Sequence, residues 1–324
     1  MKASFREVQG DAALGADPAR LDSVGIVLGV AGAVLFSMKA VLVKLAYAEV
    51  PDLPAVTLMV LRMGLSLPVY LAILLIARRA GEGRIGGRQT LAAMAAGVLA
   101  YYVCTFLDFQ GLKYITAQLE RLLLFTYPAF VVVFGALFFG GRITRAGVAA
   151  VALAYAGLAV VFLGGDITES DDLWLGAGLI VLCAMLFALF QLIAKRFVDR
   201  IGARVFTCLA MIGASTALMI HFVIASGGVA GMVDAFDLPG RLWVIAVALA
   251  VFCTLMPSFF VNMAIGRIGA QLVAILGMIG PLATIVAAIV VLGEPFGLWD
   301  GVGTAVTLIG IALYTYSNAK PRKT

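Results

Sequence analysis

Five ionisable side chains interrupt long apolar stretches of this sequence: Lys39, Arg62, Asp108, Glu120 and Arg121. A charged side chain placed in hydrocarbon costs roughly 2.5–3.5 kcal/mol even on permissive insertion scales. Residues of this kind therefore pair with one another, bind a polar or charged ligand, or carry a proton. Cations and carboxylates together provide the chemistry for all three roles.

Glu120 is the strongest of these candidates because of the helical face beside it. Gln118, Arg121, Phe125 and Pro128 recur at i, i+3, i+7 and i+10, so a helix presents them on one side, with Glu120 on the adjoining side. A band that changes from polar to aromatic suits the wall of a binding cavity better than contact with lipid. We expect Glu120 to bind substrate or to couple it to protons.

The other ionisable residues leave alternatives open. Lys39 lies eight residues from the outer end of its run, about 12 Å at 1.5 Å per residue, which exceeds the reach of its stem and favours an interior position. Arg62 either pairs with Glu120 or Asp108 to hold helices together, or contacts substrate. Asp108 is expected mainly as a solvated residue at a helix end, with a coupling role as the alternative.

Composition indicates the environment of these residues. Charged residues make up 13% of the 324 residues, against about 25% in soluble proteins, and hydrophobic residues make up 63%. So few charges cannot cover a water-exposed surface, which excludes a soluble enzyme, a disordered chain and a nucleic-acid-binding protein. A polytopic membrane protein with the lipid bilayer as its solvent remains.

Ten apolar runs are long enough for a helix of about 20 residues to cross the hydrocarbon core. The runs are 24–47, 55–77, 89–109, 115–139, 145–164, 174–194, 204–226, 240–263, 270–292 and 298–317. Short turns at Gly111 and Gly266 are expected to separate the third run from the fourth and the eighth from the ninth. The predicted fold class is an all-α integral membrane protein with ten transmembrane helices.

The basic residues orient these helices. With a cytoplasmic amino terminus, the Lys and Arg residues of 78–88, 142–145, 195–204, 267 and 320–323 all lie in the cytoplasm. Only Lys44, Lys113 and Arg241 remain outside. The positive-inside rule therefore predicts cytoplasmic termini in a bacterial inner membrane. Residues 1–23 lack a signal-peptide pattern and are expected to form a disordered cytoplasmic tail, as are residues 319–324.

Two motifs recur in the second half at a nearly constant offset. Residues 35–37 match 186–188 at an offset of 151, and residues 117–119 match 270–272 at an offset of 153. The chain is therefore predicted to contain two repeats of five helices, residues 24–165 and 173–318. An odd number of spans makes the second repeat inverted, the arrangement that permits alternating access to a central site.

The second repeat has apolar residues where the first is charged. The counterparts of Lys39, Asp108, Glu120 and Arg121 are Phe190, Val261, Val273 and Ala274. The second repeat supplies neutral amides instead, which can bind a polar ligand without the desolvation cost of a charge. These candidate substrate-binding residues are Gln191, Asn262 and Gln271.

Two prolines are candidate hinges, and several small residues are candidate points of close helix packing. Pro128 and Pro281 match at the offset of 153, and each removes a helical hydrogen bond within a span, so we predict hinges there. Small residues in the fifth and tenth runs predict close helix packing. They are Ala150, Ala154, Gly157, Gly303 and Gly310.

Leu61-Arg62 in the second run, Gln118 to Pro128 in the fourth and Leu292-Gly293-Glu294 after the ninth carry a family resemblance. With the two repeats, they resemble the EamA-type transporters of the drug/metabolite transporter superfamily. The resemblance implies a ten-helix carrier, commonly an exporter of amino acids, metabolites or toxic compounds. Gly141 stands at the first-repeat position of Glu294, which weakens a shared role for this loop acid in transport.

Enzyme functions lack the necessary residues. His221 is alone, the four cysteines are scattered through apolar runs, and no GxxxxGK[ST] loop is present. We expect neither a metal, a cofactor, a nucleic acid nor an obligatory protein partner.

The predicted function is secondary active export of a small organic substrate by alternating access. The alternatives are a facilitative channel and a membrane sensor or scaffold without flux. Lys39, Arg62 and Arg121 outnumber Asp108 and Glu120 by one charge, so a carboxylate on the substrate, as in amino acids, supplies the missing partner. Protons are the expected coupling ion.

Overall fold

The computed structural model describes residues 22–83, 85–139, 145–164, 172–228, 235–277 and 279–319. These residues form helices joined by turns, and no strand occurs among them. Helices are the expected outcome because a backbone surrounded by hydrocarbon has to satisfy its hydrogen bonds within its own segment. The predicted tails at 1–23 and 319–324 lie almost entirely outside the described residues.

The helices of the first half are α1 (Ser23–Ser37), α2 (Lys39–Glu49), α3 (Ala55–Arg79), α4 (Gly87–Gly97), α5 (Thr105–Gly111), α6 (Ala117–Leu124), α7 (Tyr127–Phe139) and α8 (Arg145–Gly164), with a π-helix, η1 (Val98–Cys104), between α4 and α5. Those of the second half are α9 (Leu173–Ile201), α10 (Ala203–Ala225), α12 (Gly240–Ala250), α13 (Met256–Gly277), α14 (Ile279–Ala287) and α15 (Leu298–Ala319), with π-helices η2 (Val251–Leu255) and η3 (Ala288–Leu292).

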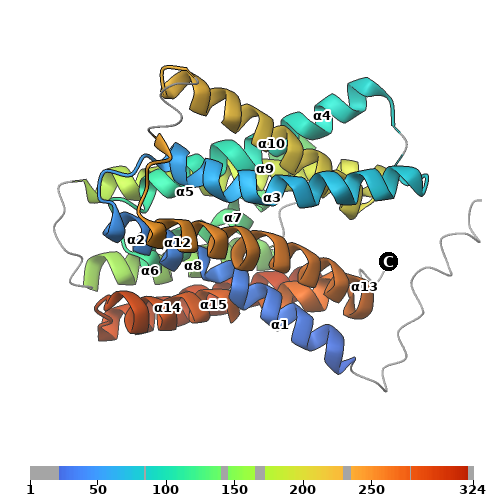
Figure 1. Ribbon diagram of the computed structural model, residues 1–324. Coiled ribbons are helices and arrows are strands. Elements are labelled where there is room, and N and C mark those ends of the chain that lie inside the picture. The colour runs from blue at the N-terminus through green and yellow to red at the C-terminus, as the bar shows by residue number, and fades with distance from the viewer. Residues whose placement is uncertain are drawn as a thin grey trace, which may run out of the picture.

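Figure 1 shows these helices lying alongside one another in a bundle, with α4 and α10 on one side and α14 and α15 on the other. Seven helices among the described residues are long and apolar enough to cross a membrane. They begin at Ser23, Ala55, Gly87, Ala117, Leu173, Ala203 and Gly240. The other three apolar runs are helical as well, as α8, α14 with η3, and α15. An all-helical membrane fold is thereby confirmed.

The turn predicted at Gly266 is wrong. α13 continues through Gly266 to Gly277, and with α12 and η2 it forms one helical stretch from Gly240. A single glycine costs a helix only about 1 kcal/mol relative to alanine. This cost is too small to end a helix by itself, so the helix continues through Gly266.

Two helices of the first half are interrupted within their spans. The first breaks at Met38, between α1 and α2, and the other breaks at Phe125 and Thr126, between α6 and α7. Interrupted helices at membrane depth occur where the backbone is buried in protein or lines a cavity. These two breaks therefore mark the region in which to look for a site.

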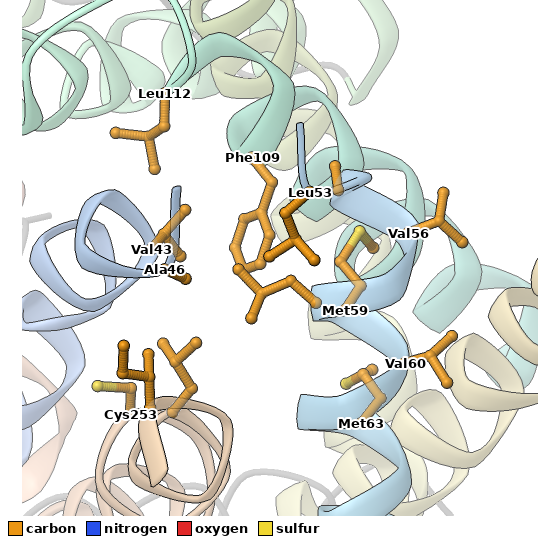
Figure 2. Packing of buried hydrophobic residues seen from close by; sticks show 14 of the residues in the cluster. Val43, Ala46, Leu53, Val56, Met59, Val60, Met63, Phe109, Leu112 and Cys253 are labelled. Atoms are coloured by element: carbon orange, nitrogen blue, oxygen red, sulfur yellow. The ribbon is translucent and has the colours of Figure 1, made fainter. Parts of the chain in front are cut away.

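The main apolar core fixes the position of α5 in the bundle. Figure 2 shows Phe109 of α5 between Val43 and Ala46 of α2 on one side and Met59 of α3 on the other. Phe109 is fully buried, and its backbone carbonyl accepts a hydrogen bond of 2.9 Å from the hydroxyl of Tyr47. Asp108, the preceding residue, is held in place by this packing.

α8 and α15 pack closely through glycines. A Cβ atom on Gly157 would lie 2.4 Å from the backbone nitrogen of Thr307 and 2.5 Å from the carbonyl oxygen of Gly303. Backbone atoms cannot move aside as a flexible side chain can. The close packing predicted for these two glycines is confirmed.

We expect Gly157→Ala to destabilise the protein by about 1–3 kcal/mol, because the added methyl group overpacks the α8–α15 contact. Thermal unfolding of the detergent-purified protein measures the effect. Gly178→Ala is the matched control, since Gly178 lies within α9 and a Cβ there meets nothing within 4 Å. Equal unfolding temperatures for the two variants would contradict the packing seen here.

Candidate functional site

The break at Met38 places Lys39 inside the bundle. Lys39 is the first residue of α2 and is 8% exposed, so its predicted interior position is confirmed. Its ammonium group donates a hydrogen bond to Oδ2 of Asp108 and lies 4.0 Å from Oε1 of Glu120. Lys39 therefore interacts with carboxylates from two other helices.

Asp108 is buried, and the expectation of a solvated residue at a helix end is wrong. Only 1% of its surface is exposed. The expectation counted residues along an uninterrupted α-helix, but η1 precedes α5, and a π-helical turn changes the direction in which the following side chains point. Asp108 thereby faces Lys39, whose charge offsets its desolvation.

Glu120 is fully buried on α6, between the two cations nearest to it. Its Oε2 lies 3.9 Å from Nε of Arg121, and its Oε1 lies 4.0 Å from the ammonium nitrogen of Lys39. Neither oxygen has a hydrogen-bond partner among the described residues. Glu120 thus interacts with both cations at distances beyond a direct hydrogen bond.

Arg121 joins the two halves of the chain. Its Nη2 donates to the backbone carbonyl of Ser37 at 3.0 Å, and its Nε donates to the hydroxyl of Thr284 at 3.2 Å. Thr284 in turn donates to the same Ser37 carbonyl at 2.9 Å. Three segments, the end of α1, α6 and α14, therefore meet at the carbonyl that precedes the Met38 break.

Ser37 and Thr284 were not among the predicted site residues. Hydroxyl residues in helices commonly bond to the carbonyl four residues earlier, and both do so here, with Ala33 and Gly280 as acceptors. A hydroxyl residue in an apolar helix is thus a weak signal on its own. The functional contact of Ser37 uses its backbone, which no side-chain pattern reveals.

Gln118 lies at the start of α6 and contacts the second half of the chain. The backbone amides of Ala117 and Gln118 donate to the carboxylate of Glu294 at 2.8 and 3.3 Å. The side-chain amide of Gln118 donates to the carbonyl of Pro295 at 3.1 Å. Glu294 therefore caps the positive end of α6, a contact that its first-repeat counterpart Gly141 has no side chain to make.

Arg62 is buried beside this cluster and differs from the other cations. It is 5% exposed, and its Cζ lies 5.4 Å above the ring of Phe109. Its Nη2 contacts the sulfur of Met63 at 3.8 Å, while its Nε has no hydrogen-bond partner among the described residues. No carboxylate of the described residues lies within 4.0 Å of the guanidinium, so Arg62 forms no direct ion pair with Glu120 or Asp108, and Asp108 interacts with it only at longer range.

Of the three predicted neutral amides, only Gln191 has a described side chain, and it does not join this cluster. Gln191 lies on α9 with an exposed side chain and makes no hydrogen bond to the charged residues. Asn262 and Gln271 both belong to α13, and their side chains lie outside the described part of the chain.

Pro128 lies near the start of a helix. It is the second residue of α7, directly after the break at Phe125 and Thr126. Proline is well tolerated in a first turn because the amide it lacks has no partner there. The regular helix is therefore interrupted before Pro128 and not by the proline itself. Pro281 belongs to α14, and residue 278, which precedes α14, lies outside the described residues.

His221 has a structural partner. Its Nδ1 lies 2.6 Å from the hydroxyl of Tyr102, and the ring of Phe106 packs edge-on against it. The four cysteines are buried free thiols. Within the described ranges, no three His, Cys, Asp or Glu side chains come together in a way that could bind a metal ion.

Taken together, Lys39, Asp108, Glu120 and Arg121 form a buried charged cluster with two cations and two carboxylates. Arg62 adjoins it as a third cation. A cluster of this kind can bind an anionic group or exchange a proton.

Asp108→Asn should destabilise the protein by about 3–5 kcal/mol, because it leaves the Lys39 charge buried without its main partner. The double variant Lys39→Met with Asp108→Leu should regain most of this loss, since it leaves no uncompensated charge. Thermal unfolding in detergent measures both.

The control for this pair is Arg241→Gln, which removes an ion pair of 3.2 Å with Glu49 at the surface. We expect a change of about 0–1 kcal/mol there. A double variant that is no more stable than Asp108→Asn would contradict the pairing of Lys39 with Asp108.

Comparison with known proteins assigns the fold. A solved structure, described only as a crystal structure of a protein, superposes with a TM-score of 0.61 at 18% sequence identity, covering 90% of this chain and 96% of that one. At this identity the likeness concerns the fold alone.

Three sequence relatives from Bacillus subtilis (strain 168) carry the name of transporter. The uncharacterized transporter YcbK is 30% identical over 310 residues, 93% of this chain and 96% of its own length. The uncharacterized transporter YcxC is 26% identical over 217 residues, and YyaM is 21% identical over 253 residues.

The family profile described as the EamA-like transporter family matches the chain twice, over residues 23–163 and 174–316. Both copies of the match include residues that meet at the Ser37 carbonyl. The chain belongs to the EamA-like transporter family.

Proposed function

We propose that this protein is a secondary active exporter of small carboxylate-bearing metabolites, such as amino acids, that works by alternating access in a bacterial inner membrane. It crosses the membrane ten times, as two inverted repeats of five helices with both termini in the cytoplasm. The observation that carries the proposal is the buried charged cluster, whose contacts join the two repeats at the break in the first helix.

The π-helices support the repeat independently of the sequence motifs. η1 begins at Val98 and η2 begins at Val251, so their starts differ by 251 − 98 = 153 residues. The same offset relates residues 117–119 to 270–272. A rare helical form at equivalent positions favours two copies of one five-helix unit, and an odd number of spans makes the two copies opposite in direction.

Charged contacts at the ends of the bundle support the orientation. Arg204 pairs with Glu82 at 3.2 Å, and Arg267 pairs with Asp22 at 2.9 Å. The start of α1 and the end of α3 lie at the same end of the bundle in Figure 1. Basic residues near these positions are the ones that the positive-inside rule assigns to the cytoplasm.

Closure at the outer end depends on Glu294 in this proposal. The carboxylate of Glu294 belongs to the second repeat and caps α6 of the first, beside the contact of Gln118 with Pro295. Opening toward the outside requires the two segments to separate at these hydrogen bonds. The break at Phe125 and Thr126 then allows α6 to move relative to α7, the hinge role proposed for Pro128 and its counterpart Pro281.

Glu120 is the proposed proton carrier. It is fully buried with both oxygens lacking a hydrogen-bond partner among the described residues, and Lys39, Arg121 and Asp108 are the charged groups that surround it. A carboxyl group in such a place exchanges protons when the site opens. Asp108, paired with Lys39, is the second candidate for coupling.

The direct test is export followed by counterflow. Cells that overproduce the protein should release more of at least one amino acid or organic acid, measured by mass spectrometry of the medium. The purified protein in liposomes should then carry that metabolite at a saturable rate, and unlabelled metabolite on the opposite side should accelerate uptake of the label.

Flux that neither saturates nor responds to counterflow would favour a channel, and absence of flux for every released metabolite would favour a sensor or scaffold. The Glu120→Gln variant should retain counterflow and lose acceleration by a proton gradient. Normal gradient-driven flux in this variant would remove Glu120 from the coupling step.

The Glu294 contact has its own test. In a variant without the four native cysteines, Gln118→Cys should react faster with an impermeant thiol reagent when Glu294 is replaced by Ala, because the outer end opens more often. Asp300→Ala is the control, since Asp300 accepts a hydrogen bond only from the nearby Gly297 amide. Equal labelling rates with and without the Glu294 carboxylate would contradict a closing role.

A further inference from the structure

We propose that Arg62 is the residue that receives the substrate's carboxylate, at a site between α3, α5 and η2, and that the preferred substrates carry a single carboxylate. This inference rests on the proposed transport function and identifies the specificity-determining residue of its site. The juxtaposition that supports it is a buried guanidinium over the Phe109 ring, next to a cluster whose other cations already have partners.

The first step is the occupancy of the other two cations. The Lys39 ammonium group is paired with Asp108. The Arg121 guanidinium donates from Nε and Nη2 to Thr284 and to the Ser37 carbonyl, so its position is set by the backbone. A ligand carboxylate would have to displace a protein contact at either residue.

Arg62 needs no such displacement. Its Nε lacks a partner among the described residues, and its Nη2 has only the weak thioether acceptor of Met63, at 3.8 Å. Arg62 as a residue is only 5% exposed. A desolvated cation without an anionic partner is costly, and this cost is relieved when a ligand carboxylate binds.

The geometry around Arg62 suits a planar carboxylate. A guanidinium presents parallel donors that match the two oxygens of a carboxylate, and Phe109 covers one face of the group at 5.4 Å. Ser66 donates to the Arg62 carbonyl at 2.8 Å. Tyr70 lies two turns further along α3, with its hydroxyl 3.2 Å from that of Ser258 on α13. Neutral hydroxyl groups thus lie along the same face as the guanidinium.

The balance of buried positive and negative side chains favours substrates with one carboxylate. Lys39, Arg62 and Arg121 carry three positive charges, and Asp108 and Glu120 carry two negative charges when both are ionised. In the state in which Glu120 is ionised, one ligand carboxylate balances the excess positive charge, whereas a second would leave an excess negative charge in a desolvated region.

The competing explanation is that Arg62 is a structural partner of Asp108. The titratable side chains that interact electrostatically with Arg62 are those of Asp108, Cys253 and Tyr70. Asp108 lies beyond 4.0 Å from the guanidinium and is already bonded to Lys39. The two explanations predict opposite effects of Arg62→Met on the protein without ligand.

The experiment uses the full-length protein in detergent, first without ligand. If Arg62 lacks a partner until substrate binds, Arg62→Met should unfold at the same temperature as the parent or about 2 °C higher. Unfolding more than about 2 °C below the parent would identify a structural partner of Asp108 and overturn the proposal.

The second arm uses a panel of thermal-shift ligands: proteinogenic amino acids with a single carboxylate and short monocarboxylates, each with its primary amide, and the matching dicarboxylates. We expect the parent to bind monocarboxylates with an affinity at least tenfold higher than that for their amides or dicarboxylate analogues. Arg62→Met should abolish this preference, Arg62→Lys should retain part of it, and the surface control Arg241→Gln should retain all of it.

Equal binding of acid and amide, or binding to Arg62→Met within twofold of the parent, would overturn the role of Arg62. Failure of every carboxylate to stabilise the parent would overturn the substrate class. In either case the counterflow assay still reports whether the protein transports a solute, so failure of this inference is distinguishable from failure of the proposed function.

Discussion

The interaction on which the interior of this protein depends is the buried ion pair between Lys39 and Asp108. Both side chains are buried, so each charge needs a partner within the bundle. Two backbone features orient these side chains toward each other. The break at Met38 places Lys39 at the start of a new helix, and the π-helix η1 before α5 turns Asp108 toward the interior. The core around Phe109 then fixes α5 against α2 and α3.

The two halves of the chain contribute different chemistry to the same region. All five buried ionisable residues of the site belong to the first half. The second half supplies the hydroxyl of Thr284, which meets Arg121 at the Ser37 carbonyl, and the carboxylate of Glu294, which caps α6. A solute that binds among the charges therefore affects contacts between the halves, which is what a transporter with alternating access requires.

Much of the fold followed from composition and apolar runs, since hydrocarbon permits few structures other than helices. The turn at Gly266 did not, because a single glycine costs a helix too little to end it. Asp108 was misplaced for a related reason. Its distance from the helix end was calculated for a regular α-helix, and no residue type predicts a π-helical turn such as η1.

The sequence by itself determined which residues are costly to bury, that positive charge exceeds negative charge among them by one, and that the chain repeats at an offset near 153. These properties depend only on residue types and their spacing. The tertiary structure alone decided the partners: Asp108 with Lys39, Arg121 with the Ser37 carbonyl, and Glu294 with the start of α6. Pairing depends on distances of a few ångströms between segments up to 247 residues apart, as for Thr284 and Ser37, and such distances are set by helix breaks and packing that local sequence does not encode.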